Sequence, residues 1–304
     1  MTLRQLGAVF GVLAALAAVW LSVRNRDSST EPSLDLGALI QLDVDEIIIS
    51  PPDTSTVRLQ LTSGHWTVNG YPARDSLVQA LLGRLDTLPQ AHFIARSPAT
   101  HERLGVTPEA ATRVEVGSTT SSGVVFLLGG TGPEGRFVRV PEQTEVFVIP
   151  EAAVQDLDRE EFRWRDPTIV TVDTASLSRI VVSRGSDLPF ALRRNEVGNW
   201  LVDGVPADTI AMRMFLETVE DMQAAGFPAD SFVFAVDFDR PDAILDLYLG
   251  DDLTDAPTVS LLFASIPTRT DVLVRRADNP IVYAVDSRRA NLLTAGRSRL
   301  LRQP

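Results

Sequence analysis

The chain has 304 residues with 28 basic and 40 acidic side chains, and every basic residue is an arginine. The absence of lysine and cysteine excludes lysine Schiff bases, the lysine of phosphate-binding loops, cysteine nucleophiles, disulfides and thiolate metal sites. The net charge of −12 is spread along the chain, and an acidic surface repels phosphate backbones, so we expect no nucleic-acid partner. The length predicts about two domains, each large enough to bury a core.

The N-terminus carries an apolar segment. Residues 6–23 (LGAVFGVLAALAAVWLSV) contain no charge, and as a helix they would span about 27 Å, close to the hydrocarbon core of a membrane. We therefore predict a signal anchor over residues 1–26 and a polar linker over residues 27–40. A cleaved signal peptide is the alternative, because Ala15-Leu16-Ala17 has the small-x-small form of a cleavage site. Both hypotheses place the body outside the cytoplasm, and the anchor predicts a single-pass protein of the cytoplasmic membrane.

The body contains two copies of one sequence pattern. Residues 64–73 (GHWTVNGYPA) reappear as residues 198–207 (GNWLVDGVPA), a shift of 134. Each copy holds a dipeptide typical of a type I′ turn, Asn69-Gly70 or Asp203-Gly204. Strand-like and turn-like runs before and after these segments also correspond in order. We therefore predict a first repeat unit over residues 41–167 and a second over residues 168–304.

Each unit is predicted to form three short strands, one amphipathic helix and a run of further strands. Helical spacing of apolar residues marks the two helices: Leu77, Val78, Leu81, Leu82, Leu85 and Leu88 in the first, and Ile210, Met214, Phe215, Val219 and Met222 in the second. Asp75 and Asp208 are the candidate capping residues at the helix starts. The later strands are predicted at 112–116, 123–128, 136–140 and 145–149, and at 244–249, 258–264, 271–275 and 281–285. Hairpin-spaced strands with one main helix indicate an α+β fold, a largely antiparallel sheet in each unit.

No catalytic, cofactor-binding or metal-ligating residues can be assigned. His65, His92 and His101 lack zinc-ligand spacing, and the glycine-rich residues 129–137 lack the lysine of a phosphate loop and are better read as a hairpin. Acidic groups occur at residues 43–46, 156–161, 237–242 and 251–255, but none follows the calcium-loop pattern. Two carboxylates distant in sequence could still meet in an acid/base site. We expect a protein that is not an enzyme and has no cofactor, metal or small-molecule ligand.

Aromatic and arginine residues allow two interpretations each. Trp66 and Trp200 stand just before the tight turns, which favours core packing over stacking on a ligand. Residues 161–167 (EFRWRDP) alternate aromatics with arginines, which indicates stacking at the junction of the units or, alternatively, an exposed patch for a partner. The arginines near the C-terminus are expected to lie on a solvated helix face, with a contact to anionic lipid as the alternative.

The same residues resemble a known family. A single N-terminal span, Trp66 before an Asn-Gly turn, Leu104-Gly105-Val106-Thr107-Pro108 leading into a strand and the run 135–140 (GRFVRV) are similar to bacterial envelope proteins grouped as domain of unknown function 4340. The second unit departs from this pattern, with residues 238–241 (FDRP) in place of the Leu-Gly turn. Members of the family commonly occur beside ABC-transporter components of the gliding-motility type. The resemblance thus implies a transporter-associated partner and supplies no catalytic residue.

The leading hypothesis is a non-catalytic, membrane-anchored extracytoplasmic accessory or scaffold protein of an ABC-type envelope complex. Two alternatives stay open. One is a module that binds cell-envelope glycan or peptidoglycan through an exposed tryptophan, Trp66, Trp164 or Trp200. The other is a carboxylate-dependent hydrolase, which would need two acids about 5–10 Å apart in a pocket.

Overall fold

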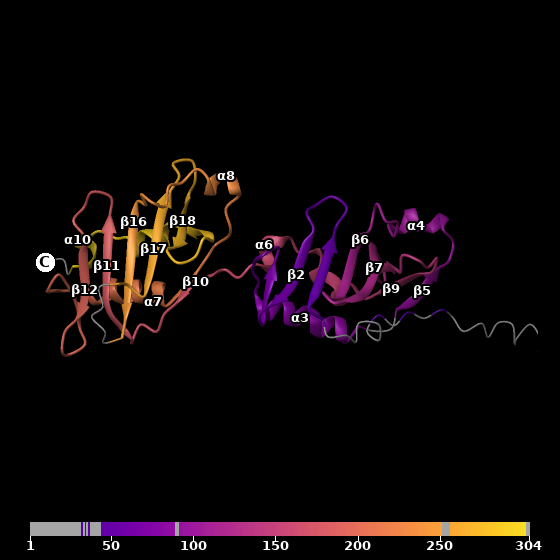
Figure 1. Ribbon diagram of the computed structural model, residues 1–304, viewed down its shortest axis with the longest axis horizontal. Helices are drawn as coiled ribbons and strands as arrows, with labels where there is room; N and C mark the ends of the chain where they lie inside the picture. Colours follow the sequence, from indigo (N-terminus) through magenta and orange to yellow (C-terminus); the bar gives the residue numbers. More distant parts are fainter. Residues whose placement is uncertain are drawn as a thin grey trace, which may run out of the picture. The chain divides into compact units, whose positions relative to one another are not determined.

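The protein divides into two compact units, residues 1–165 and 166–304 (Figure 1). The computed structural model describes Pro32, Leu34, Leu36 and residues 44–88, 91–250 and 256–301. The predicted anchor, residues 1–26, lies outside these residues. Within the described part, no helix is both long and apolar enough to cross a membrane. The division falls two residues before the boundary drawn from the sequence repeat.

The first unit is built on one antiparallel sheet of nine strands in the order β4-β3-β2-β1-β6-β7-β8-β9-β5. Its strands are β1 (Glu46–Ser50), β2 (Val57–Thr62), β3 (His65–Val68), β4 (Tyr71–Pro72), β5 (His92–Ala95), β6 (Thr112–Ser118), β7 (Ser121–Gly132), β8 (Gly135–Arg139) and β9 (Val146–Ile149). Its helices are α3 (Asp75–Asp86), α4 (Ala99–Leu104), α5 (Glu151–Val154), the 3₁₀ turn η1 (Gln155–Asp158) and α6 (Glu161–Trp164).

The second unit repeats this plan with an eight-stranded antiparallel sheet in the order β14-β13-β12-β11-β16-β17-β18-β19. Its strands are β11 (Leu177–Arg184), β12 (Phe190–Arg194), β13 (Trp200–Val202), β14 (Val205–Pro206), β16 (Ala243–Leu249), β17 (Val259–Ser265), β18 (Asp271–Arg276) and β19 (Val282–Asp286), with a separate pair β10 (Thr168–Thr171) and β15 (Asp221–Gln223). Its helices are α7 (Thr209–Glu220), α8 (Asp230–Val233), α9 (Ser287–Leu293) and α10 (Arg297–Leu300). The predicted α+β class with largely antiparallel sheets is confirmed.

The two units match down to single hydrogen bonds. Asn69 and Asp203 both have left-handed φ angles, 48° and 47°, as a type I′ turn requires. The side chain of each then accepts a bond from a strand N–H, of Arg58 at 2.8 Å and of Ala191 at 2.9 Å. The same turn chemistry therefore forms the β3–β4 turn and the β13–β14 turn and joins each of them to a neighbouring strand, β2 or β12.

Each sheet packs its long helix against one face to form the main core. In the first unit, Ile47, Leu59 and Leu81 are fully buried in this core. Leu34 and Leu36 are also buried there, although they lie in the segment predicted to be a linker. In the second unit, Leu245 and Phe215 occupy the centre of the corresponding core. A smaller apolar cluster lies on the opposite face of each sheet, with Leu104 at the end of α4 in one and Phe238 after α8 in the other.

Candidate recognition groove in the second unit

The acidic groups within the described residues hold the fold together. Asp45 accepts bonds from Ser118 and from the Thr119 backbone and hydroxyl, and the Thr119 backbone bond is the main cause of its lowered pKa. Asp156 is buried and pairs with Arg159 at 2.6 Å and with Arg84. These carboxylates have arginine or backbone partners, which accounts for their presence without a ligand.

Several acids of the other groups have similar roles. Asp158 pairs with Arg136 at 2.6 Å, and Glu161 pairs with Arg165 at 2.6 Å. Asp242 accepts the N–H of Ser265 at 2.7 Å. Residues 251–255 lie outside the described part of the chain.

The histidines do not come together. His65 lies on β3 with its ring 3.5 Å from Asp75, His92 lies on β5, and the His101 ring contacts the Thr144 carbonyl at 2.8 Å. Among the described residues, no group of three or more His, Asp or Glu side chains could hold a metal ion.

The glycine-rich segment is a β-hairpin, as predicted. Gly132 of β7 pairs with Gly135 of β8. Gly135 has a φ of 137°, and a Cβ there would overlap the backbone carbonyl of Ile149. A Cβ on Gly129 would in the same way strike the Leu104 carbonyl at the end of α4. These glycines are therefore required by close backbone packing and form no phosphate loop.

The arginine–aromatic run at the end of the first unit is mostly internal. Trp164 is fully buried, and the Arg165 guanidinium lies 3.6 Å from the centre of the Tyr71 ring. Phe162 is exposed, with Arg163 over its ring at 5.4 Å. Stacking is thus confirmed, and the contacts observed lie within the first unit.

The arginine residues of the resemblance pattern also have structural roles. Arg139 is buried and donates to the carbonyls of Val106, Pro141 and Gln143 at 2.9–3.0 Å. Burial lowers the pKa of its guanidinium below the ordinary value. Near the C-terminus, Arg297 pairs with Asp203 at 2.9 Å and is otherwise exposed.

Of the tryptophans in the described residues, Trp200 alone reaches an open surface. Trp66 has only 3% of its surface exposed and Trp164 has none, so both are core residues. Trp200 is partly buried at the margin of the second core. The prediction of core packing is therefore confirmed for Trp66 and incomplete for Trp200.

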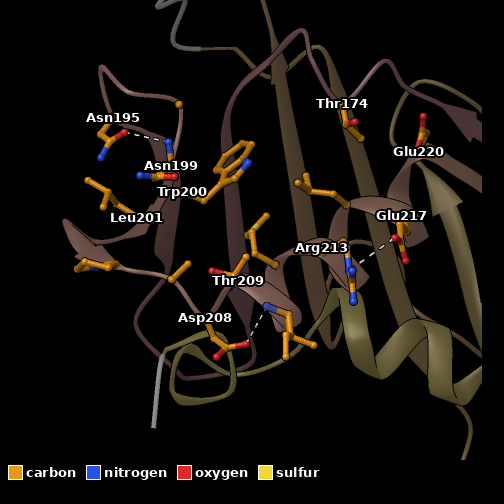
Figure 2. Close-up of a pocket in the computed structure, with 16 residues that line it drawn as sticks. Thr174, Asn195, Asn199, Trp200, Leu201, Asp208, Thr209, Arg213, Glu217 and Glu220 are labelled. Carbon is orange, nitrogen blue, oxygen red and sulfur yellow. Dashed lines mark hydrogen bonds and ion pairs between the residues drawn. The ribbon is translucent and has the colours of Figure 1, made fainter. Parts of the chain in front are cut away.

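Trp200 lines a groove of about 790 Å³ between β13, β14 and α7 (Figure 2). The apolar part of the groove wall is formed by Trp200, Leu201, Pro206, Ala207, Ile210, Met212 and Leu216. Asn195 and Asn199 lie on the side of the hairpin, and Arg213 and Glu217 on the side of the helix. The groove thus combines an indole, aliphatic side chains and charged side chains on one surface.

Several polar groups of the groove already have partners. The Asp208 carboxylate accepts the N–H groups of Ile210 at 3.0 Å and Ala211 at 2.9 Å, which makes it the N-cap of α7, as predicted. Asn195 accepts the N–H of Asn199 at 2.9 Å. Arg213 and Glu217 form an ion pair of 3.8 Å.

Asp75 does not cap α3. The N-cap position there is Arg74, without a side-chain bond to the helix. Asp75 lies one residue further on and accepts the N–H of Trp66 at 3.0 Å. The prediction was wrong because the two aspartates occupy positions that differ by one residue in the two repeats.

The prediction for the second helix also needs correction. Phe215 and Val219 are buried, as predicted, and Met212 is buried with them, whereas Ile210 is 63% exposed and Met214 is 47% exposed. Met222 lies beyond the helix, in β15. Apolar spacing alone could not separate the buried face of α7 from an apolar flank exposed beside the groove.

The fold defines the protein as a tandem repeat of two α+β units, each an open antiparallel sheet covered by one long helix. The chain belongs to the family described as Domain of unknown function (DUF4340), whose model matches residues 66–237. This match covers more than half of the chain and includes every residue of the groove. No curated protein and no solved structure matches the chain.

Proposed function

We propose that this protein is a non-catalytic accessory protein that binds a protein partner through the groove of its second unit. The observation that carries the proposal is the half-buried Trp200, which lines the groove together with Ile210, a large apolar side chain left 63% exposed on α7. Partly buried aromatic residues bordered by apolar and charged groups are typical of protein interfaces.

The setting of this interaction is the cell envelope. The apolar residues 6–23 are long enough to anchor the chain in the cytoplasmic membrane as a single span, with the body outside the cytoplasm. Relatives of the family commonly occur beside ABC-transporter components, so we propose that the partner is a subunit of such a complex.

A carboxylate-dependent hydrolase has less support. Of the three acids that line the groove, Asp208 is held as a helix cap and Glu217 pairs with Arg213. A glycosidase needs one carboxyl group free to donate a proton and a second free to act as nucleophile or base. Of these three acids, only Glu220 has a carboxylate without a hydrogen-bond or ion-pair partner among the described residues.

The proposal is tested by photo-crosslinking in intact cells. A photoreactive amino acid replaces Ile210 in the groove, and matched variants carry it at Leu188, which is 91% exposed in the second unit, or at Ile94, which is 40% exposed in the first. After detergent extraction, we expect transporter subunits to be crosslinked from position 210 and not from the control positions. Recovery of the uncrosslinked protein alone, or the same products from all three positions, would contradict the proposal.

A glycan is the second candidate ligand, because Trp200 lies beside Asn195 and Asn199, and sugars stack on indole faces and bond to amides. Titration with soluble peptidoglycan fragments tests this candidate. A change in tryptophan fluorescence that disappears in Trp200→Phe would support glycan binding, and no change in the unmodified protein would exclude these fragments as ligands.

A further inference from the structure

We infer that the groove beside α7 binds a cationic, apolar peptide segment of the partner, and that recognition is confined to the second unit. This inference rests on the proposed function and specifies the chemistry of the partner. It follows from a comparison of the exposed flanks of two helices that occupy the same place in the repeated fold.

The comparison is possible because α3 and α7 correspond position by position. Both have 12 residues. The N–H of Arg74, just before α3, donates to the Trp164 carbonyl, and the N–H of Asp208, just before α7, donates to the Leu300 carbonyl, each at 2.8 Å. These bonds fix a shift of 134 residues between the helices.

The apolar flank of α7 has no counterpart on α3. Ile210 corresponds to Ser76 and Met214 to Ala80, and both residues of α3 are exposed. Ile210 lines the groove with the half-buried indole, and Met214 follows about one turn further along α7. Their exposed side chains form an apolar strip on the helix, which a partner would remove from water. The first unit offers no such strip on its helix.

The indole of the second unit is also less covered. Three positions that pack on the first core carry smaller residues in the second unit. Tyr71 and Leu77 correspond to Val205 and Ala211 at the shift of 134, and Trp164 corresponds to Leu300 as the acceptor of the equivalent backbone bond. Val78 and Leu81 correspond to the larger Met212 and Phe215, which lie buried in the core. Side-chain volume is thus lost near the start of α7 and gained in the core beneath it.

The charge of the groove selects the ligand. Its charged lining consists of Asp208, Glu217 and Glu220 against Arg213. Glu220 is exposed, and its carboxylate has no side-chain partner within the described part of the chain. Glu217 has its arginine only at 3.8 Å, with both side chains about two-thirds exposed. An apolar strip bordered by Glu220 and by a lining with three acidic side chains and one basic side chain complements a peptide in which apolar residues accompany lysine or arginine.

The dimensions suit a peptide. A helix of 12 residues is about 18 Å long. That length accommodates about three turns of a partner helix or about five residues of an extended segment. A sugar would find fewer free partners along this surface, because the Asp208 and Asn195 side chains already accept backbone N–H groups.

The experiment selects ligands for the full-length protein in detergent micelles from a displayed library of random 12-residue peptides. We expect enrichment of sequences with apolar residues and lysine or arginine. For the synthesised peptides, Trp200→Ala should weaken binding about 30-fold, as for a central interface residue. Glu220→Lys should weaken it about 2- to 5-fold, the effect of one exposed ion pair, and peptides with glutamate in place of lysine should regain that loss on this variant.

Two controls separate specific from general effects. Asp86 is the first-unit position that corresponds to Glu220, so Asp86→Lys makes the same charge change away from the groove. Leu188→Ala removes an exposed apolar side chain outside the groove. Both variants should bind the peptides within twofold of the unmodified protein, and circular dichroism should show that Trp200→Ala is folded.

The outcomes distinguish this inference from the proposed function. Crosslinking from position 210 together with peptides that lack basic residues, or that ignore Glu220→Lys, would overturn the inference and leave the proposed function standing. The inference is also overturned if no peptide is enriched, or if Asp86→Lys weakens binding as much as Glu220→Lys. If no transporter subunit is crosslinked from position 210, the proposed function itself is contradicted.

Discussion

The matched tryptophans give the most direct test of the difference between the units. Trp66→Ala and Trp200→Ala make the same chemical change at corresponding positions of β3 and β13. A tryptophan buries about 150–250 Å² when enclosed, and its truncation to alanine in a core costs about 3–5 kcal/mol. Trp66 is 3% exposed and should show the full cost.

Trp200 should show a much smaller cost. Its indole lines an open groove and is only partly buried, so less apolar surface is lost and no closed cavity is left behind. About 1–2 kcal/mol is expected at about 25 cal/mol for each Å² of apolar surface. The same substitution should therefore differ by about 2–3 kcal/mol between the two units.

Hydrogen exchange measured by mass spectrometry on the full-length protein can assign each loss to its own unit. Peptides from β1 and β6 should lose protection in Trp66→Ala, and peptides from β11 and β16 should lose less in Trp200→Ala. Trp66→Phe and Trp200→Phe serve as milder controls. Equal losses in the two units would refute the conclusion that Trp200 borders an open surface, and with it the structural basis of the groove.

Three further outcomes follow from individual contacts. Asp208→Ala should destabilise the second unit by about 1 kcal/mol through loss of the α7 cap, while Asp208→Ser should retain most of the stability. Thermal unfolding of both variants measures the difference, and equal losses of stability would contradict a capping role. Gly135→Ala should destabilise the first unit by more than 2 kcal/mol in chemical denaturation, because a Cβ would overlap the Ile149 carbonyl, whereas Gly83→Ala, with open space around the Cβ, should not destabilise. Bonds from Arg269 lower the pKa of Asp271 below its ordinary 3.8, and bonds from Arg276 do the same for Asp278. The stability that these two carboxylates contribute is therefore present above about pH 4 and is lost as the pH falls through the lowered pKa values. In Asp271→Asn the free energy of unfolding should fall less steeply with acid, and an unchanged dependence on pH would contradict this assignment.

The sheets could be predicted because their signals are local. Short apolar runs mark β1 and β16, and the Asn-Gly and Asp-Gly turns fix the hairpins between β3 and β4 and between β13 and β14. Because the same sequence pattern occurs in both units, each of these strands and turns is predicted once in each unit. The short strands β5 and β15 were not predicted, because three or four residues carry too little periodicity and depend on the sheet beside them.

The groove could not be predicted for a different reason. The spacing of Ile210 and Met214 with Phe215 and Val219 fits a buried helix face, and only the packed structure shows that Met212 is buried there while Ile210 and Met214 are exposed. The sequence signal that could have revealed it is the comparison of the two copies. Ile210 and Met214 stand where the first copy has Ser76 and Ala80, a contrast that a shared core position would not show.

The bonds that join the end of each unit to the start of its own long helix bear on how such a protein could arise. The Trp164 and Leu300 carbonyls each accept an N–H from the residue before the helix of the same unit, and short bridges at Ala73–Arg165 and Ala207–Leu301 lie beside them. Each unit therefore contains both the donor and the acceptor of the bonds that join its last residues to the start of its long helix. A duplicated gene segment would yield a second fold with these contacts already in place, and the new copy could then change the surface of its helix without weakening the first.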